Sequence, residues 1–459
     1  MDQSIIRISK ELGDIQKNCD LSIAVACRDV DVRNVKALVM GPHETPYEFG
    51  FFEFAIRFHK EYPSKSPTVV CATTNGGRCR FNPNVYSNGK VCLVIMVLLK
   101  VRTLDLTSIS TWRGERGEEW SSAQGLESIL LSIQSLLSSN PYENEPGFED
   151  ANEESDKKAQ KDYVQKIRHE TLRISVIQRL EGYLGLSSNG AQQHGASGVE
   201  VEDEDVDETT VPFEPFKDLC KRRFLWYFES YQAAVEKGKS ETKPNQPFAR
   251  MPFESPGNNS MDGKFNYPEL ERRLHAIKAA IDAEPLKWAE EGLEAKKRET
   301  TVAVNLQHQF EQVVEAFKKS DMPHDVFLEN ENPFVWVVTY FGRPMTNLDG
   351  GLFRIKMNFS VRFPEEQPRV KFETNIFHHH IAEDGTACYT PNPAKKEDVR
   401  SHIEAIFAIL EDDEPAYDPR KIVRPEATKM YWGGGADNKK KYNRLLRRSV
   451  QKSVEDFPE

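Results

Sequence analysis

The chain has 459 residues, 38% of them hydrophobic and 10% aromatic, which is enough apolar material for two or three domains with separate cores. Its formal net charge of −11 argues against a general binder of nucleic acid or of anionic membranes, because both partners are negatively charged. Seven cysteines without a CxxC pair indicate neither a zinc framework nor a disulfide set, and they favour reduced thiols in a cytosolic or nuclear compartment.

The N-terminal part of the chain is predicted to contain a helix, a meander of strands and a second helix. The apolar residues at helical spacing in the first helix are Ile5, Ile8, Leu12 and Ile15. Strand-like runs separated by Pro- and Gly-rich turns follow at residues 34–41, 50–58 and 66–73. Residues 122–139 return to an apolar helical pattern. This order predicts an α+β fold, in which an antiparallel meander packs against helices.

An internal repeat is the most informative feature of the chain. The order strand, Gly turn, aromatic strand, Phe-x-x-x-x-Pro turn, strand, polar tripeptide, turn and cysteine occurs twice. The last tripeptide residue and the cysteine are Asn84 and Cys92 in the first copy, and His380 and Cys388 in the second. The predicted organisation is a core domain at 1–150, a helical extension at 151–186, an acidic flexible linker at 187–212, a continued helical extension at 213–298, a second domain at 299–432 and a basic tail at 433–459.

The first copy has the residue types that acyl transfer needs. A lone cysteine is more often a small core residue, but Cys92 follows a turn at Asn88-Gly89 and has Asn84 nearby in the chain. The Asn84 side chain could donate an N–H to an oxyanion or hold the loop in place. The motif contains no base of the kind a cysteine hydrolase needs. An acyl group that arrives as an activated thioester would need only a thiolate and an oxyanion donor.

Several motifs resemble the ubiquitin-conjugating enzymes. They are FHKEYPSKSPTVV, FNPNVYSNGKVCL, Trp120-Ser121-Ser122 and SIQSLLSSNPYENEP. In that family a His-Pro-Asn tripeptide precedes the catalytic cysteine at this spacing. Here Asn82 replaces the histidine, while Asn84 keeps the oxyanion position. Further motifs over roughly the first 285 residues resemble the large Z-type subgroup, which has a C-terminal extension.

The resemblance implies a role for each matching residue. Cys92 would accept ubiquitin or a ubiquitin-like modifier from an activating enzyme and pass it to a substrate lysine, directly or through a ligase. Leu93 would border the ubiquitin tail, and Glu143 and Asn144 fall where the family has an acidic gate that orients and helps deprotonate the attacking amine. The positions considered for partner docking are Arg7, Lys10, Ser64 and Ser122. The aromatic residues expected to anchor the extension on the first domain are Phe224, Trp226, Tyr227 and Tyr231.

Two departures from the family pattern bear on activity. Ser64 stands where a phenylalanine commonly precedes the Lys-Pro-Pro turn, and Ser121-Ser122-Ala123 replaces a Ser-Pro-Ala, so generic docking of ring-type ligases is disfavoured. Residues 96–110 stand where the family runs almost directly from the cysteine segment to Gly-Thr-Trp. We interpret them as translated intron sequence retained in a gene model, with a partner site as the alternative.

The second copy has lost part of the motif. It keeps the family's first histidine at His378, but His379 and His380 stand where proline and asparagine belong, so the oxyanion amide is missing. Consecutive residues of an extended chain point in alternate directions, and we therefore do not expect the three histidines to bind one metal ion. We predict that the Cys388 site is inactive and that this domain is a binding module. The basic tail is interpreted as a solvated terminal helix, or as a docking surface for an acidic partner.

Two hypotheses of different class follow. Asn84 and Cys92 favour a conjugating enzyme, whereas Asn82 and the insertion favour an inactive variant that acts as a ubiquitin-pathway scaffold. No cofactor, nucleic acid or membrane partner is expected. The N-terminus lacks a signal-peptide core, and the longest apolar run, residues 93–99, is far shorter than the roughly 20 residues that span a bilayer. We expect a soluble cytoplasmic or nuclear protein.

Overall fold

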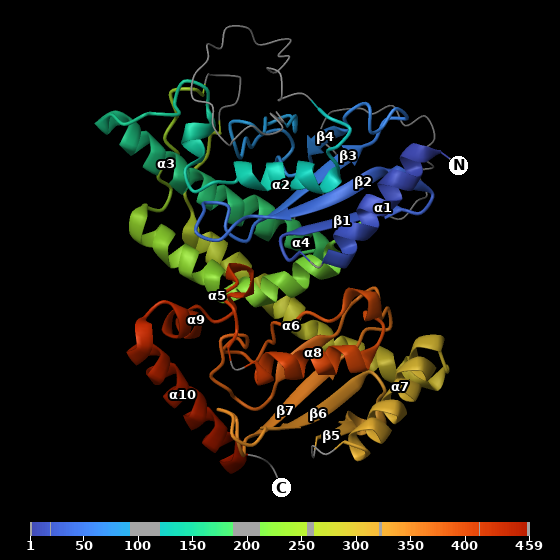
Figure 1. Cartoon of the computed structure of the whole chain (residues 1–459). Helices are drawn as coiled ribbons and strands as arrows, with labels where there is room; N and C mark the ends of the chain where they lie inside the picture. The colour runs from blue at the N-terminus through green and yellow to red at the C-terminus, as the bar shows by residue number, and fades with distance from the viewer. Residues whose placement is uncertain are drawn as a thin grey trace. The chain divides into compact units, whose positions relative to one another are not determined.

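The computed structural model describes residues 2–18, 20–91, 120–186, 212–254, 261–320, 324–412 and 414–456. The chain divides into two compact units. Unit 1 comprises Met1–Lys217 and Val235–Ile277, and unit 2 comprises Asp218–Ala234 and Lys278–Glu459. Each unit contains an antiparallel four-stranded sheet together with helices (Figure 1), which confirms the predicted α+β fold with two related domains.

The sheet of unit 1 has its strands in chain order, and each strand pairs antiparallel with the next. The strands are β1 (Ile23–Arg28), β2 (Asp31–Met40), β3 (Phe51–Arg57) and β4 (Thr68–Cys71). Alternate residues of β3 point into the core, where Phe52, Phe54 and Ile56 are buried. Helices α1 (Gln3–Asn18) and α2 (Leu126–Leu136) pack against this core.

One residue predicted for the buried face of α1 is exposed. Ile8, Leu12 and Ile15 lie in the core, but Ile5 is 37% exposed. The buried position one turn before Ile8 is instead Ser4, whose hydroxyl accepts a hydrogen bond from Arg33 (2.6 Å). The prediction for Ile5 was wrong because the inward row follows i, i+4 spacing from Ser4, and a polar residue occupies its first position.

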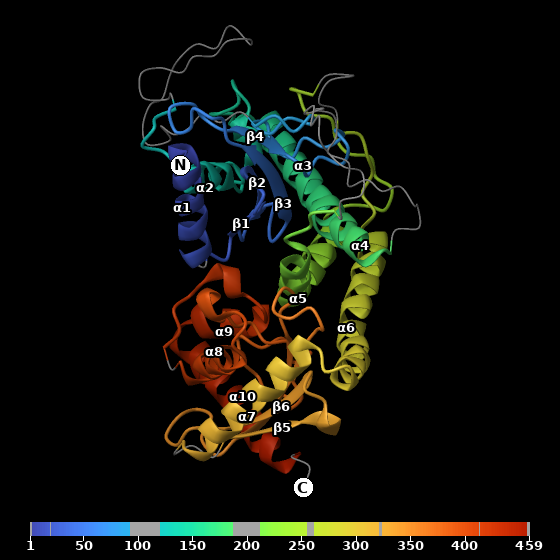
Figure 2. The same ribbon diagram turned by 90° about the vertical axis from the view of Figure 1, so that its right-hand side faces the viewer.

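Unit 1 also contains a helical segment that follows the first domain. It runs without a break through α3 (Glu154–Glu170), the π-helical η2 (Thr171–Gln178) and α4 (Arg179–Leu184). Figure 2 shows α3 on the side of the sheet opposite α1 and α2, and Tyr163 and Ile167 of α3 are part of the first core. This segment therefore completes the core of unit 1.

Unit 2 repeats the sheet of unit 1. Its strands, also in chain order, are β5 (Asp325–Leu328), β6 (Val335–Phe341), β7 (Leu352–Asn358) and β8 (Arg369–Phe372). Its helices are α7 (Thr301–Lys318), α8 (Val399–Glu411), α9 (Pro425–Trp432) and α10 (Gly435–Glu455). Short 3-10 turns lie at η3 (Glu329–Glu331), η4 (Pro393–Lys395) and η5 (Pro419–Lys421).

The repeat extends to details of packing. In the Phe-x-x-x-x-Pro turn of unit 1, the rings of Phe58 and Tyr62 meet edge to face with centroids 4.7 Å apart. The corresponding rings of unit 2, Phe359 and Phe363, meet edge to face at 5.2 Å. These contacts are equivalent because the aromatic residues flank the same turn in both copies.

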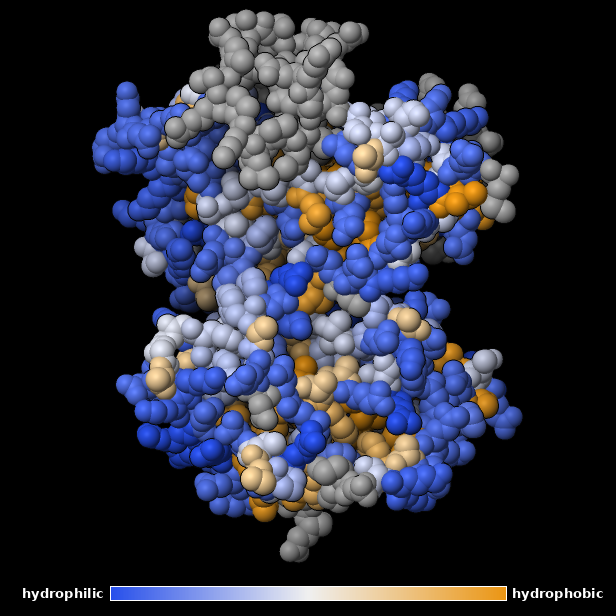
Figure 3. Space-filling view, in the orientation of Figure 1, coloured by the Kyte–Doolittle hydropathy of each residue, from blue (hydrophilic) through white to orange (hydrophobic). Residues whose placement is uncertain are grey.

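The basic tail forms a helix, as expected, but it is not solvated all round. Tyr442, Leu446 and Val450 of α10 are buried in the core of unit 2. Its basic residues occupy the remaining faces, which are part of the hydrophilic surface in Figure 3. The tail is thus an amphipathic element of unit 2, and the charge-rich composition concealed an apolar row at i, i+4 spacing.

Helices α5 (Lys217–Glu241) and α6 (Tyr267–Lys297) contribute residues to both units. The aromatic residues of α5 that we expected to anchor the extension on the first domain belong to unit 2, where the hydroxyl of Tyr227 donates to the carbonyl of Arg420 (2.6 Å). That prediction was wrong, since an apolar helix face does not specify which core it joins. Of the helices in the described ranges, none combines the length and apolar character that a membrane crossing requires.

Candidate functional site

The Asn-Pro-Asn tripeptide follows β4 and is held by the side chain of its first residue. Asn82 is fully buried. Its Nδ2 donates to the hydroxyl of Tyr47 (3.2 Å) and to the carbonyl of Leu136 (2.8 Å), and its Oδ1 accepts from the backbone N–H of Asn84 (2.8 Å). One carboxamide therefore ties the loop to α2 and fixes the backbone at Asn84. The side chain of Asn84 is half-buried and makes no hydrogen bond to another described residue.

The turn that leads toward the cysteine is fixed by a glycine. Gly89 has a φ of +86°, and a Cβ there would lie 2.6 Å from the carbonyl oxygen of Cys71. The bridge between Val85 and Val91 brings the chain back beside the tripeptide. Val91 is the last described residue before Cys92. Cys92, Leu93 and the insertion at 96–110 lie outside the described residues.

Arg80 is a further determinant of this loop, and the motif analysis missed it. Its Nη2 donates to the carbonyl of Pro83 (2.5 Å) and pairs with Glu145 (3.0 Å), while its guanidinium lies over the ring of Tyr86 (5.2 Å). Burial raises the pKa of Glu145, although Arg80 acts against this shift. A charged residue two positions before the motif was the only local signal, because its partner Glu145 is distant in sequence.

The segment expected to form the acidic gate lies against the same helix end. Glu143 and Asn144 belong to η1 (Pro141–Asn144). The Nδ2 of Asn144 donates to the carbonyl of Leu136 (3.0 Å), which also accepts from Asn82. Glu143 is exposed. The tripeptide and the gate segment are therefore joined through one backbone oxygen.

The four residues considered for partner docking lie on neighbouring segments of unit 1. The guanidinium of Arg7 donates to Glu11 (2.8 Å) and to the carbonyl of Gln124 (2.8 Å), and the Glu11 hydrogen bond raises the pKa of Arg7. The indole of Trp120 donates to the carbonyl of Pro63 (2.6 Å). These bonds connect α1 to both loops. Of the four docking candidates, Lys10, Ser64 and Ser122 are exposed.

Glu11 is the centre of this contact and was also missed. It accepts hydrogen bonds from Arg7, from the hydroxyl of Tyr62 (2.7 Å) and from the backbone N–H of Leu126 (2.9 Å). One carboxylate thus joins α1, the Phe-x-x-x-x-Pro turn and the start of α2. Arg7 serves this internal network, so Lys10 is the basic side chain of α1 that remains exposed at this end.

The second copy preserves the loop geometry with different side chains. The backbone N–H of His380 donates to Nδ1 of His378 (3.1 Å), as that of Asn84 does to Asn82. Gly385 has a φ of +84°, as the corresponding turn glycine of unit 1 has +86°. Burial lowers the pKa of His380 to about 4, so its imidazole is neutral. Among the described residues no three His, Cys, Asp or Glu side chains are grouped to hold a metal ion.

Cys388 is closed off from solvent. It is 1% exposed, and burial raises the pKa of its thiol to about 12. Within unit 2, the Arg223 guanidinium favours the thiolate, but its effect is smaller than that of burial. A neutral, inaccessible thiol cannot attack a thioester on a partner protein, because the thiolate is the nucleophile. This arrangement supports the prediction that the second site is inactive.

The comparisons with known proteins agree with this fold. The family model described as ubiquitin-conjugating enzyme matches residues 7–171 and 305–433. The chain therefore belongs to the ubiquitin-conjugating enzyme family, and it contains two segments of that family's core.

The curated relatives that the chain resembles are named as ubiquitin-conjugating enzymes. The chain is 33% identical over 279 residues to "Ubiquitin-conjugating enzyme E2 Z" of Homo sapiens, which covers 61% of this chain and 64% of the relative. The protein of the same name from Danio rerio is 42% identical over 279 residues, covering 61% and 69%. A "Dual E2 ubiquitin-conjugating enzyme/E3 ubiquitin-protein ligase BIRC6" of Homo sapiens is 36% identical over 162 residues, which is 35% of this chain and 3% of the relative.

Proposed function

We propose that the chain is an active ubiquitin-conjugating enzyme that carries ubiquitin or a ubiquitin-like modifier as a thioester on Cys92. The observation that carries this proposal is the hydrogen bonding of Asn82, which does for the loop what a histidine does elsewhere in the family. Replacement of that histidine is therefore no argument for inactivity. The side chain of Asn84 makes no hydrogen bond to another residue in the described part of the chain, which suits an oxyanion donor.

The proposed reaction has two half-reactions. The Cys92 thiolate attacks the thioester carbonyl that joins the modifier to its activating enzyme, and the thiolate of that enzyme leaves. A lysine amine, on a substrate or after docking of a ligase, then attacks the new thioester carbonyl. Cys92 leaves as a thiolate, and the amine loses its proton as the isopeptide bond forms. Asn84 donates to the oxyanion of the intermediate, and Glu143 assists in deprotonating the amine.

The partners follow from this chemistry. The activating enzyme is proposed to dock on α1, where Lys10 is exposed. A ligase that does not need the generic ring-type contacts is proposed to dock at the exposed Ser64 and Ser122. Unit 2 is proposed to act as a binding module and not as a second enzyme. The alternative, an inactive scaffold, is favoured only by the insertion at 96–110.

The decisive experiment incubates the purified full chain with activating enzyme, ATP and ubiquitin. The proposal predicts an ATP-dependent adduct, one ubiquitin heavier, that a thiol reductant removes. A scaffold would bind ubiquitin or its machinery without forming any covalent adduct. If no adduct forms with ubiquitin or with other ubiquitin-like modifiers and their activating enzymes, the scaffold hypothesis replaces the proposal.

A further inference from the structure

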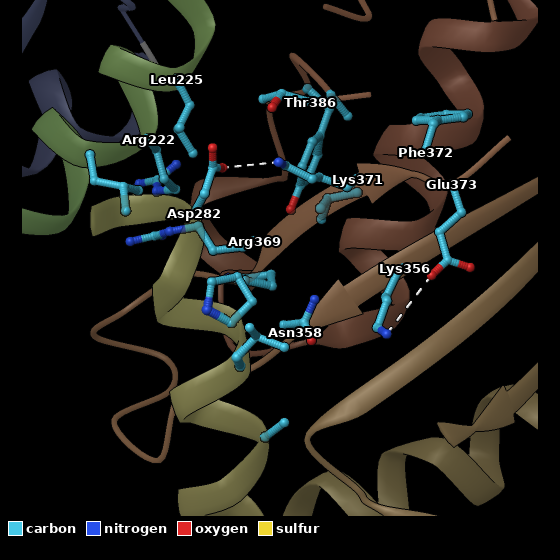
Figure 4. A pocket seen from close by; sticks show the side chains of 18 of the residues that line it. Arg222, Leu225, Asp282, Lys356, Asn358, Arg369, Lys371, Phe372, Glu373 and Thr386 are labelled. Carbon is cyan, nitrogen blue, oxygen red and sulfur yellow. Dashed lines mark hydrogen bonds and ion pairs between the residues drawn. The ribbon is translucent and has the colours of Figure 1, made fainter. Parts of the chain in front are cut away.

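The cavity of unit 2 and the loop of unit 1 use ion pairs differently. In the cavity, of about 440 Å³ beside β7 and β8, Lys371 pairs with Asp282 (2.9 Å) and Lys356 with Glu373 (3.8 Å) (Figure 4). Each of these pairs joins two side chains of the lining, and their charges balance. In the loop, by contrast, one cation, Arg80, joins a carboxylate to a backbone carbonyl of the Asn-Pro-Asn tripeptide.

The peptide group between Pro83 and Asn84 is held at both of its polar atoms. Its N–H, which belongs to Asn84, donates to the carboxamide of Asn82 (2.8 Å). Its carbonyl, which belongs to Pro83, accepts from Nη2 of Arg80 (2.5 Å). Because a peptide group is planar, two bonds from opposite edges fix the orientation of its plane. The Cα of Asn84 is part of this plane, so the orientation determines where the Asn84 side chain begins.

Arg80 is itself anchored on the segment that contains the expected gate. The same Nη2 lies 3.0 Å from a carboxylate oxygen of Glu145, the residue that directly follows η1. The side chains of Arg80 and Glu145 are 6% and 20% exposed. The guanidinium also lies over the ring of Tyr86, in the turn after the tripeptide, at 5.2 Å from the ring centroid. One side chain therefore connects the tripeptide, this turn and the gate segment.

Stability alone is a poor explanation for this arginine. Its Nε is buried and has no hydrogen-bond partner among the described residues. A buried ion pair generally contributes little net stability, because the cost of taking both charges out of water offsets their attraction. An apolar residue at this position would avoid both costs, but it could not donate to the Pro83 carbonyl. The feature that only a donor provides is the fixed peptide group next to Asn84.

We propose that Arg80 is a positioning residue for transfer of the modifier. With Glu145 as its anchor, it holds the Pro83 carbonyl and so directs the Asn84 side chain at the oxyanion that forms when the lysine attacks the thioester. Arg80 transfers no proton in this role and acts only through Asn84. The inference rests on the proposed function, since it concerns a thioester on Cys92.

The test compares the two half-reactions in the full chain, at a temperature where every variant is folded. Each variant is loaded with activating enzyme, ATP and ubiquitin, or the ubiquitin-like modifier that the parent chain accepts. ATP is then removed, and loss of the thioester after addition of free lysine is followed. Arg80→Met should slow this discharge by about 10- to 100-fold and loading by less than about threefold, because a displacement of about 1 Å near the reacting atoms can have such an effect.

A double-mutant cycle on the discharge rate shows whether Arg80 acts through Asn84. If it does, adding Arg80→Met to Asn84→Ala should slow discharge by less than about threefold further, because the group that Arg80 positions is already absent. A residue that only stabilised the fold would give independent effects that multiply. Multiplicative effects of the two substitutions therefore overturn the proposal.

Two further variants separate positioning from folding. Arg80→Met/Glu145→Leu removes both charges and should recover thermal stability relative to Arg80→Met, but not the discharge rate. Arg273→Met breaks a different ion pair of unit 1, in which Arg273 of α6 lies 2.6 Å from Glu181 of α4, and should leave discharge unchanged. Recovery of discharge together with stability, or equal slowing by Arg273→Met, contradicts the assignment. A parent chain that forms no thioester overturns the proposed function and this inference with it, whereas normal discharge by Arg80→Met overturns this inference alone.

Discussion

Two asparagines of the same tripeptide differ in what the fold uses them for. The side chain of Asn82 is fully buried. Its carboxamide donates to Tyr47 and Leu136 and accepts from the backbone N–H of Asn84. The side chain of Asn84 is half-buried and makes no hydrogen bond that links it to other described residues. Substituting each should therefore separate loop stability from chemistry.

Asn84→Ala should leave the loading of Cys92 largely intact and slow transfer to lysine. Removing one oxyanion donor costs about 10²-fold or more in rate. Single-turnover discharge of the loaded enzyme to free lysine measures the second half-reaction, and formation of the thioester measures the first. Equal losses in both half-reactions would mean that the loop has collapsed and that Asn84 is not an oxyanion donor.

Asn82→Ala should instead lower stability. Several buried hydrogen bonds are lost at once, and their usual contribution of about 1 kcal/mol each predicts a loss of roughly 2–3 kcal/mol in the free energy of unfolding of unit 1. Urea titration followed by circular dichroism measures it, with Asn88→Ala at the exposed turn as the control. A loss no larger than that of the control would show that Asn82 does not fix the loop.

The sequence identified the motif but not the residues that support it. Spacing to the cysteine located Asn84, and the glycine turn was visible as Asn88-Gly89. Asn82 was interpreted as a departure that favours a scaffold, because a family motif does not reveal that a carboxamide can make the loop's hydrogen bonds. Arg80 and Glu11 could not be recognised, since their partners are distant in the chain and a lone charge usually indicates a solvated surface.

At the scale of elements, a buried ion pair joins two segments of the extension within unit 1. The Lys166 ammonium of α3 lies 2.7 Å from Glu254, and their side chains are 0% and 3% exposed. Burial lowers the pKa of Lys166, and Glu254 opposes this shift. This pair holds α3 to the loop after α5. Removing only one of the two side chains leaves the other as an uncompensated buried charge.

Lys166→Met should therefore destabilise unit 1 by about 3–5 kcal/mol, and adding Glu254→Leu should recover much of that loss. Denaturant unfolding of the single and double variants measures both values. The exposed pair Arg272–Glu269 gives the control, since Arg272→Ala should cost no more than about 0.5 kcal/mol. A single variant as stable as the parent would mean that the pair does not hold α3.

Helices and strands could be predicted where the pattern of apolar residues along a short stretch of the chain was enough to define them. Three strands of each sheet, their turns and the repeat followed from spacing and aromatic alternation, but the first strand of each sheet, β1 or β5, was not predicted. The assignment of α5 failed because its aromatic face is equally compatible with either core. The hydrophobic period reports that a helix is buried, and it contains no information about the partner surface.

At the scale of the whole molecule, unit 2 contains a set of buried, neutral histidines. Burial lowers the pKa of His380 and of His402 to about 4 each, and it lowers the pKa values of His378 and His379 as well. Folding therefore keeps these imidazoles unprotonated below pH 6.5, where the unfolded chain binds protons. The free energy of unfolding of unit 2 is therefore highest at neutral pH and decreases as the pH falls below 6.5.

Unit 2 should accordingly unfold more easily between pH 7.5 and pH 5.0. Each such histidine contributes a loss of up to roughly 1.4 kcal/mol per pH unit below 6.5. Tryptophan fluorescence in urea measures it, since Trp226, Trp288, Trp336 and Trp432 belong to unit 2. His402→Leu should flatten the slope, and the exposed His308→Leu should not. Stability that is independent of pH in this window contradicts the account.

The central claim is that only the first copy forms a thioester, at Cys92. The most direct test loads the parent chain, Cys92→Ser and Cys388→Ser with activating enzyme, ATP and modifier, and treats half of each sample with thiol reductant. We predict a reductant-sensitive adduct for the parent and Cys388→Ser, and for Cys92→Ser an oxyester that resists reductant, because an alkoxide leaves less readily than a thiolate. A reductant-sensitive adduct on Cys92→Ser would place the nucleophile elsewhere and contradict the account.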